Sequence, residues 1–232
     1  MYILYHPKME FDSVHKLFLK AILEGDRVMA SDIISNLTEN NNAINDIYEH
    51  VIRRALYDVG ILWEEGKISV ATEHLSSAIV ESILNELYSK IISRYRTDKI
   101  VVAASVEKEV HQIGIKMVSD VFEMNGWNVH FLGADTPSKD LLKFIDTVNP
   151  GIVALSVSIY FHYPELLKII ETIRKKHPLL TIIIGGQGLR HSSGEITKQF
   201  DRVYYFPDLY KLEEFIKNFD KYGQKDIDKI SR

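Results

Sequence analysis

The stretch IVVAASVEKEVHQIG, residues 100–114, passes from an apolar run to a helical pattern. Its first six residues are apolar and partly β-branched, which predicts a buried strand. Four similar runs follow, and helical patterns separate them. Strands that alternate with helices form right-handed crossovers and a parallel sheet covered on both faces. We therefore predict a flavodoxin-like (Rossmann-type) α/β domain with a five-stranded parallel sheet in the order 2-1-3-4-5. The expected strands are 100–105, 128–133, 151–157, 181–186 and 202–206, and the expected helices are 111–125, 138–147, 163–176 and 208–219.

The preceding residues, from Phe11 to about Arg94, show helical periodicity. Four amphipathic segments with short connections predict an all-α four-helix bundle. Gly25 ends the first segment, and Asp26 is a plausible N-cap of the second. The expected domains are the bundle at 1–95 and the α/β domain at 96–232, with a linker near Arg94–Asp98 and a polar tail, 221–232, that frays. The longer bundle helices are expected at 43–64 and 69–93.

The composition of the sequence limits the classes of protein to which this chain could belong. The 232 residues are 46% hydrophobic and 26% charged, which suits a folded chain with a proper core. The net charge of -4 argues against nucleic-acid binding, and the absence of cysteine excludes disulfides and thiolate chemistry. No apolar stretch reaches transmembrane length, and the N-terminal residues lack the features of a signal peptide. We expect a cytoplasmic protein with no membrane partner.

Candidate site residues follow three predicted strands. His111 lies after the first strand, Ser156 and Ser158 at the end of the third, and Gly185 and Gly186 at the end of the fourth. In open parallel sheets, ligands bind beyond the carboxyl ends of the strands, where the strand order switches. These residues are therefore expected to meet at one crevice.

Each of these residues also has a purely structural interpretation. The histidine could be a polar residue at a helix start, the serines could belong to turns, and GGQG could be a loop that needs positive φ. Glu109 could accept a ring N–H of His111 and fix its tautomer, and Gly114 would let a flat ligand approach the backbone. An enzyme using His111 as a general base is disfavoured, because no phosphate-binding loop or oriented nucleophile accompanies it.

The set E-x-H-x-x-G at 109–114, S-x-S at 156–158 and G-G at 185–186 resembles the cobalamin-binding fold, whose usual signature is D-x-H-x-x-G, S-x-L and G-G. The resemblance covers residues 98–220. It implies that His111 is the lower axial ligand of cobalt in place of the dimethylbenzimidazole base. The departures are Glu109 for the usual Asp and Ser158 for the usual Leu. The other cofactor contacts that the resemblance implies are Val110, Gln112, Ile113, Gly114, Ser156, Val157, Gly185 and Gly186.

The segment LYDVGILWEEGKISVATEHLSSAIV, residues 56–80, joins the ends of the third and fourth predicted helices. Its short turn would bring Trp63 close to Val70, Glu73 and His74, and these side chains could roof a flat ligand. The alternatives are a core position for Trp63, a favourable helix dipole for Glu73 and a solvated partner role for His74.

The pattern W-x9-E-H, with Val70 between, resembles the cap of the CarH/LitR class of adenosylcobalamin photoreceptors. That resemblance implies that Trp63 packs over the upper ligand and that Val70 leaves room for a 5′-deoxyadenosyl group. Glu73 and His74 would contact its ribose and adenine side. In that class a histidine follows the Trp and ligates cobalt after photolysis, but Glu64 stands here. A bis-histidine light state is therefore not expected unless His74 or another histidine substitutes.

The resulting hypothesis is that the protein is a stand-alone light or cobalamin sensor and not an enzyme. It would hold adenosylcobalamin between the bundle and the Rossmann domain, and it would change conformation or assembly when light breaks the Co–C bond. No basic recognition helix is visible, so output is expected through a homo-oligomer or a protein partner, without direct nucleic-acid contact. A bilin could be a second chromophore, although the 12 tyrosines and 10 phenylalanines fit a core equally well. The main alternative is a corrinoid methyl carrier of a methyltransferase system. An isomerase subunit is disfavoured, because it would need a substrate-binding barrel and no segment of this sequence supplies one.

Overall fold

The computed structural model describes residues 7–190 and 193–220. The chain forms two compact units, Met1–Lys90 and Ile91–Arg232. The domain boundary expected at 95–96 lies in the irregular segment between the last helix of the first unit and the first strand of the second. The fraying expected for 221–232 lies outside the described residues. Among the residues described, no helix combines the length and the apolar character needed to cross a membrane.

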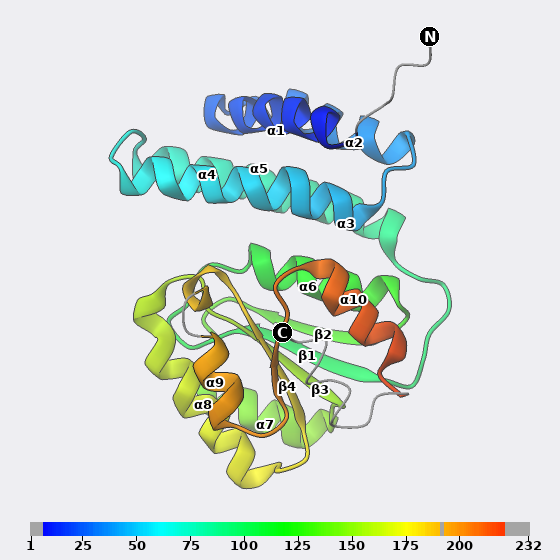
Figure 1. Cartoon of the computed structure of the whole chain (residues 1–232), viewed down its shortest axis with the longest axis vertical. Coiled ribbons are helices and arrows are strands. Elements are labelled where there is room, and N and C mark those ends of the chain that lie inside the picture. The colour runs from blue at the N-terminus through cyan, green and yellow to red at the C-terminus, as the bar shows by residue number, and fades with distance from the viewer. Residues whose placement is uncertain (1–6, 191–192, 221–232) are drawn as a thin grey trace. The chain divides into compact units, whose positions relative to one another are not determined.

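The first unit is a helical bundle, as the sequence predicted (Figure 1). The third predicted helix contains a π-helical turn, η1, which periodicity did not indicate. Gly25 has a φ of 76° after the first helix, and the Asp26 side chain accepts a hydrogen bond from the Met29 amide at 2.9 Å, which confirms the N-cap. The elements are α1 (Pro7–Glu24), α2 (Arg27–Glu39), α3 (Ile44–Ile47), η1 (Tyr48–Ile52), α4 (Arg53–Glu64) and α5 (Val70–Ile91).

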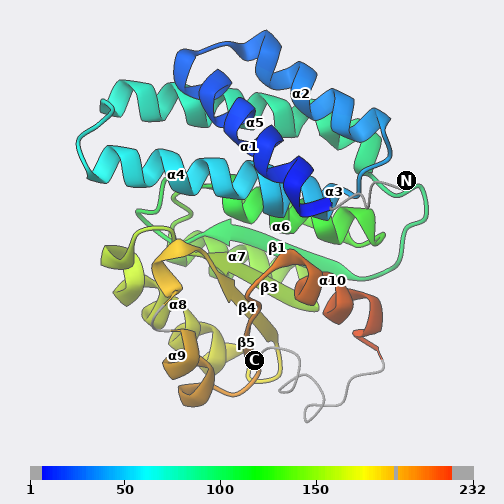
Figure 2. The same ribbon diagram turned by 45° about the horizontal axis from the view of Figure 1, so that its top comes forward.

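The second unit is the predicted five-stranded parallel sheet in the order β2-β1-β3-β4-β5. Helices α6 and α10 cover one face, and α7, α8 and α9 cover the other (Figures 1 and 2). The helix α9 and the two 3-10 segments, η2 and η3, were not predicted. The elements are β1 (Ile100–Ser105), α6 (Ile113–Met124), β2 (Asn128–Gly133), α7 (Ser138–Val148), β3 (Ile152–Ser156), η2 (Tyr160–His162), α8 (Tyr163–Lys176), β4 (Thr181–Gly185), η3 (Gln187–Leu189), α9 (Ser193–Gln199), β5 (Val203–Tyr205) and α10 (Leu209–Asn218).

Strand register determines which loops meet. Ser105 of β1 pairs with Ser156 of β3, and Ser156 pairs with Gly185 of β4. The central strands are buried on both faces, as expected for a parallel sheet covered by helices. The loops that follow β1, β3 and β4 therefore leave the sheet side by side at one edge.

The bundle carries a buried histidine that is paired with a partly exposed carboxylate. His15 of α1 is almost fully buried, and its Nε2 atom lies 2.9 Å from Oδ2 of Asp58 on α4. Burial lowers the pKa of His15, and the Arg54 guanidinium lowers it further, whereas Asp58 opposes the shift. His15 is therefore held in its neutral form at neutral pH.

This shift makes the stability of the bundle depend on pH. Because the pKa of His15 is lower in the folded chain than the ordinary 6.5, stability is fully present above pH ~6.5 and is lost as pH falls toward the folded pKa. We expect His15→Gln to reduce the slope of unfolding free energy against pH between about pH 5 and 7, as measured by urea denaturation. Equal slopes for His15→Gln and the wild-type protein would contradict this assignment.

Candidate functional site

The loop between β1 and α6 is tied to the neighbouring loop after β2. The Lys108 amide donates to Oδ1 of Asp135 at 2.6 Å, and Oε1 of Gln112 accepts from the Ala134 amide at 3.1 Å. Lys108 has a φ of 72°, a left-handed conformation that turns the chain back toward the sheet edge. The loop is thus held in one conformation by hydrogen bonds on both sides of His111.

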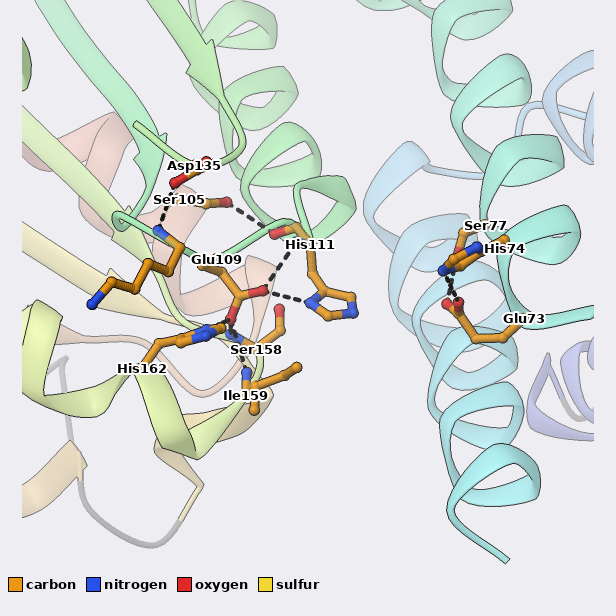
Figure 3. Close-up of polar contacts among 11 residues, drawn as sticks. Glu73, His74, Ser77, Ser105, Glu109, His111, Asp135, Ser158, Ile159 and His162 are labelled. Atoms are coloured by element: carbon orange, nitrogen blue, oxygen red, sulfur yellow. Dashed lines mark hydrogen bonds and ion pairs between the residues drawn. The ribbon is translucent and has the colours of Figure 1, made fainter. Parts of the chain in front are cut away.

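Glu109 is the buried centre of this loop (Figure 3). Its Oε1 accepts hydrogen bonds from the His111 backbone amide at 3.0 Å and interacts with Nδ1 of the same residue at 2.5 Å. Its Oε2 accepts from the Ser158 and Ile159 amides, both at 2.9 Å, and lies 3.1 Å from Nδ1 of His162. One carboxylate therefore joins the loop after β1 to the loop after β3 and to the start of α8.

The hydrogen bonds keep Glu109 ionised although it is inaccessible to solvent. Burial alone raises the pKa of this carboxyl group, but the donors around it outweigh that effect. The His111 ring makes the largest lowering contribution, followed by the Ile159 amide, and the pKa falls from 4.5 to about 2. Glu109 is a carboxylate at neutral pH and can only accept hydrogen bonds.

The state of Glu109 determines the tautomer of His111. Because the carboxylate accepts, Nδ1 of His111 carries a proton, and in the neutral imidazole the lone pair is on Nε2. The His111 side chain is 42% exposed. The carbonyl of the same residue accepts from the buried Ser105 hydroxyl at 2.9 Å. The helix predicted to begin at 111 begins at Ile113, so His111 lies in the loop before α6.

The predicted serines and glycines lie at the same sheet edge but in different environments. Ser156 and Val157 are buried, whereas Ser158 is half-buried and its amide contacts Glu109. A Cβ added at Gly114 or Gly185 would meet no atom within 4 Å. These two positions leave open space beside the backbone, which fits the approach of a flat or extended group.

Gly186 has a different role from Gly185. Its φ is 106°, and a Cβ there would lie 2.1 Å from the carbonyl oxygen of Val157. The structural interpretation of GGQG, a loop that needs positive φ, therefore holds for Gly186. Gly188, which sequence reasoning did not single out, donates its amide to the Val157 carbonyl at 3.1 Å in the same close packing.

Two of the expected cofactor contacts near His111 differ in their exposure to solvent. Val110 is 65% exposed, whereas the Ile113 side chain is buried. Ile113 lies in the first turn of α6, and its contact with a cofactor stays a prediction.

The predicted cap residues lie in the first unit. Trp63 near the end of α4 is 46% exposed, and Val70 at the start of α5 is 51% exposed, so the alternative that Trp63 is a core residue is wrong. Glu73 accepts from the Ser77 hydroxyl at 2.9 Å, and its other oxygen lies 3.5 Å from Nε2 of His74 (Figure 3). Glu73 and His74 lie three and four residues after Val70 on α5 and so are on the same side of this helix as Val70, whereas the approach of Trp63 to them stays a prediction.

His162 is a residue of the second unit that sequence reasoning missed. It is the last residue of η2, and its side chain is only 15% exposed. It lies outside every motif considered above, and its only sequence signal is a histidine shortly after the third strand. Within the described part of the chain, no group of three or more His, Asp or Glu side chains is arranged to hold a metal ion, and the single-ligand prediction for His111 is independent of such a group.

Comparison with known families defines the class of this protein. Residues 99–206 match a family model described as a B12 binding domain, and residues 14–88 match a second model with the same description. The chain is therefore a cobalamin-binding protein, with a helical and a Rossmann-like B12 binding domain.

Relatives of this chain include corrinoid proteins and transcriptional repressors. The chain is 25% identical over 146 residues to dimethylamine corrinoid protein 1 of Methanosarcina acetivorans. This alignment covers 61% of this chain and 68% of the relative. The chain is 28% identical over 145 residues to the HTH-type transcriptional repressor CarH of Myxococcus xanthus, covering 62% of this chain and 48% of the repressor. The match thus spans about half the length of that repressor. The solved structure of the Methanosarcina barkeri monomethylamine corrinoid protein has a TM-score of 0.77 at 12% identity, covering 90% of this chain and 99% of that one, and shows that the fold is shared.

The two adjacent glycines at the end of β4 and directly after it give a matched test. Gly186→Ala is expected to lower the free energy of unfolding by at least about 2 kcal/mol, because the methyl group would overlap the Val157 carbonyl at a positive φ. Gly185→Ala should change it by less than about 1 kcal/mol, since nothing lies within 4 Å of the new methyl. Urea denaturation of the cofactor-free proteins measures both, and similar losses for the two variants would contradict the distinction. Cobalamin binding by Gly185→Ala should nevertheless weaken, because the methyl would occupy space predicted for the cofactor.

Proposed function

We propose that this protein holds cobalamin with His111 as the lower axial ligand of cobalt. The observation that carries the proposal is the Glu109–His111 pair, in which a buried, ionised carboxylate holds the proton on Nδ1. That arrangement leaves Nε2 with the lone pair that a metal needs, and a carboxylate on the opposite nitrogen raises the basicity of a ligating imidazole. The open space at Gly114 and Gly185 fits a flat ring system and an extended tail.

Each residue of the loop has a separate task in this proposal. When bound, the cofactor supplies a cobalt–carbon bond that light or a nucleophile can cleave. Glu109 orients the imidazole, and the Ser158 and Ile159 amides fix Glu109. The Ser105 hydroxyl holds the His111 carbonyl, so that the backbone on either side of the ligand is fixed before the cofactor arrives.

We further propose that the upper ligand is an adenosyl group and that the protein is a light or cobalamin sensor. The exposed side chains of Trp63 and Val70 and the Glu73–His74 pair support recognition of a ligand with an apolar and a polar side. Similarity to the repressor CarH supports the same proposal. Loss of the adenosyl group would remove contacts made only in the dark state and shift the population toward another conformation or assembly.

A corrinoid methyl carrier is the second candidate function. It is supported by the similarity to dimethylamine corrinoid proteins, of which the match covers 68%. A further solved neighbour, with a TM-score of 0.52 at 17% identity, belongs to the methanol:cobalamin methyltransferase complex of Methanosarcina barkeri. In this alternative, the partner would be a methyltransferase that draws the methyl group from the cofactor.

Axial ligation by His111 can be tested by electron paramagnetic resonance of the protein loaded with cob(II)alamin. The unpaired electron of Co(II) couples to an axial nitrogen, so protein labelled with 15N-histidine should show doublets where unlabelled protein shows triplets. His111→Ala should lose this coupling, because no imidazole then reaches cobalt.

The isotope separates the protein ligand from the benzimidazole of the cofactor, which stays unlabelled. His130→Ala, in a histidine of β2, is the control and should keep the wild-type signal. Triplets that persist in labelled wild-type protein, or doublets that persist in His111→Ala, would rule out this ligand.

The sensor and the carrier differ in their response to light. A sensor loaded with adenosylcobalamin in darkness should change both its absorption spectrum and its elution in size-exclusion chromatography on illumination. Trp63→Ala should lower the selectivity for adenosylcobalamin over methylcobalamin by about tenfold, the order expected for one lost aromatic contact.

Ile61→Ala is the matched control for the tryptophan, since Ile61 is equally exposed on the same helix. A protein with no change in shape or assembly after photolysis, but with methyl transfer to an added methyltransferase, would favour the carrier. Unchanged selectivity in Trp63→Ala would remove this residue from the proposed cap.

A further inference from the structure

The residues just before His111 form a tight turn with an unusual third residue. The Glu109 amide donates to the Val106 carbonyl at 3.0 Å, which closes the turn. The third residue of this turn, Lys108, has a φ of 72°. Glycine is the usual residue where a turn needs a positive φ at its third position, because a Cβ makes a left-handed backbone costly. A lysine keeps that conformation only if its surroundings hold it there.

Three consecutive side chains of the turn contact three different elements. Oε2 of Glu107 accepts from the Ser138 amide at the start of α7 at 3.2 Å. Nζ of Lys108 donates to Oε1 of Glu165 in α8 at 2.5 Å. Oε2 of Glu109 accepts from two amides of the loop after β3. The direction in which Glu109 leaves the loop therefore depends on the left-handed residue that precedes it.

Asp135, in the loop after β2, holds the turn at two points. Its Oδ1 atom accepts from the Lys108 amide at 2.6 Å, and its own amide donates to the Glu109 carbonyl at 2.8 Å. Figure 3 shows Asp135 close to the loop that carries Glu109. Asp135 itself has a φ of 44°, which aspartate tolerates better than most residues. The two hydrogen bonds enclose the left-handed residue and supply the support that it requires.

We propose that Asp135 is a positioning residue for the cobalt ligand, because its carboxylate keeps Lys108 left-handed and thereby directs Glu109 and His111 before cobalamin arrives. The inference rests on the proposed axial ligation by His111. Without the acceptor, Lys108 can relax to a negative φ, and the chain then enters the loop of His111 in another direction. Only the fraction of molecules in which the turn is formed is then ready to bind cobalt.

Two substitutions of Asp135 separate the hydrogen bond from the charge. Asp135→Asn removes the charge but keeps an oxygen that can accept from the Lys108 amide. Asp135→Gly removes the acceptor, and glycine still adopts the positive φ of this position. Lys108→Gly is the complementary change, because glycine adopts the left-handed conformation without a partner. It should therefore rescue Asp135→Gly.

Two quantities are measured in the 232-residue chain. The first is the dissociation constant for cobalamin, from an absorption titration. The second is the fraction of bound cob(II)alamin that shows the 15N-histidine doublet in electron paramagnetic resonance. We expect Asp135→Gly to weaken binding about three- to tenfold and to lower the doublet fraction, since fewer molecules are ready to bind. Asp135→Asn and the double variant Asp135→Gly/Lys108→Gly should both lie within about twofold of the wild-type affinity.

Glu165→Gln is the matched control, because it removes the side-chain partner of Lys108 and leaves the backbone partner in place. It should keep the wild-type affinity and doublet fraction. A loss in Glu165→Gln as large as that in Asp135→Gly would overturn the proposal, because the lysine side chain would then hold the turn. Failure of Lys108→Gly to rescue would overturn it too, since Asp135 would then act in another way.

The doublet separates a failure of this proposal from a failure of axial ligation. If the labelled wild-type protein shows no 15N doublet, ligation by His111 is wrong. If the wild type shows the doublet but Asp135→Gly keeps the same affinity and doublet fraction, only the role of Asp135 is wrong. A loss in Asp135→Asn equal to that in Asp135→Gly also refutes this role, because the charge would then be what matters. Asp135→Ala, which also lacks the acceptor, replaces Asp135→Gly if that protein does not fold.

Discussion

The buried carboxylate of Glu109 is the interaction on which the rest of the candidate site depends. It lies where the loops after β1 and β3 meet, and it is ionised although no water reaches it. An unpaired charge in that position would be strongly destabilising, so the surrounding donors are a structural requirement as well as a functional one. The same donors bring His111, Ser158 and His162 to one place.

The sheet provides the edge on which this carboxylate acts. Parallel pairing of β1 with β3 and of β3 with β4 places Ser105, Ser156 and Gly185 in one row. The loops that follow lie side by side, and on the side of β2 the side-chain oxygens of Gln112 and Asp135 accept hydrogen bonds from the Ala134 and Lys108 amides. The proposed cobalt ligand, His111, is therefore carried by a loop, but that loop has little conformational freedom left to lose when a cofactor binds.

Local patterns predicted most of the fold, and long-range contacts explain what they missed. Hydrophobic periodicity predicted the bundle and the positions of the strands because it reports burial, and the alternation of strands with helices predicted the strand order. The Glu109–His111 contact was predictable because it spans only two residues. The contact of His162 depends on the η2 turn, which has no periodic signal. Gly185 and Gly186 are identical in sequence, yet one faces open space and the other packs against Val157, a difference that only the path of the chain between β3 and β4 determines.

The length of the Glu109 side chain explains why this chain departs from the usual aspartate. From the same backbone position, an aspartate would end about 1.5 Å earlier, one carbon–carbon bond. It could keep a contact with the neighbouring His111 more easily than with the loop after β3, where Ser158, Ile159 and His162 all meet Oε2. The extra methylene thus extends the reach of the carboxylate toward the loop after β3. Glutamate at 109 and histidine at 162 are best understood as a pair, in which the longer acid makes the second imidazole reachable and the second imidazole helps to stabilise the longer acid as a buried anion.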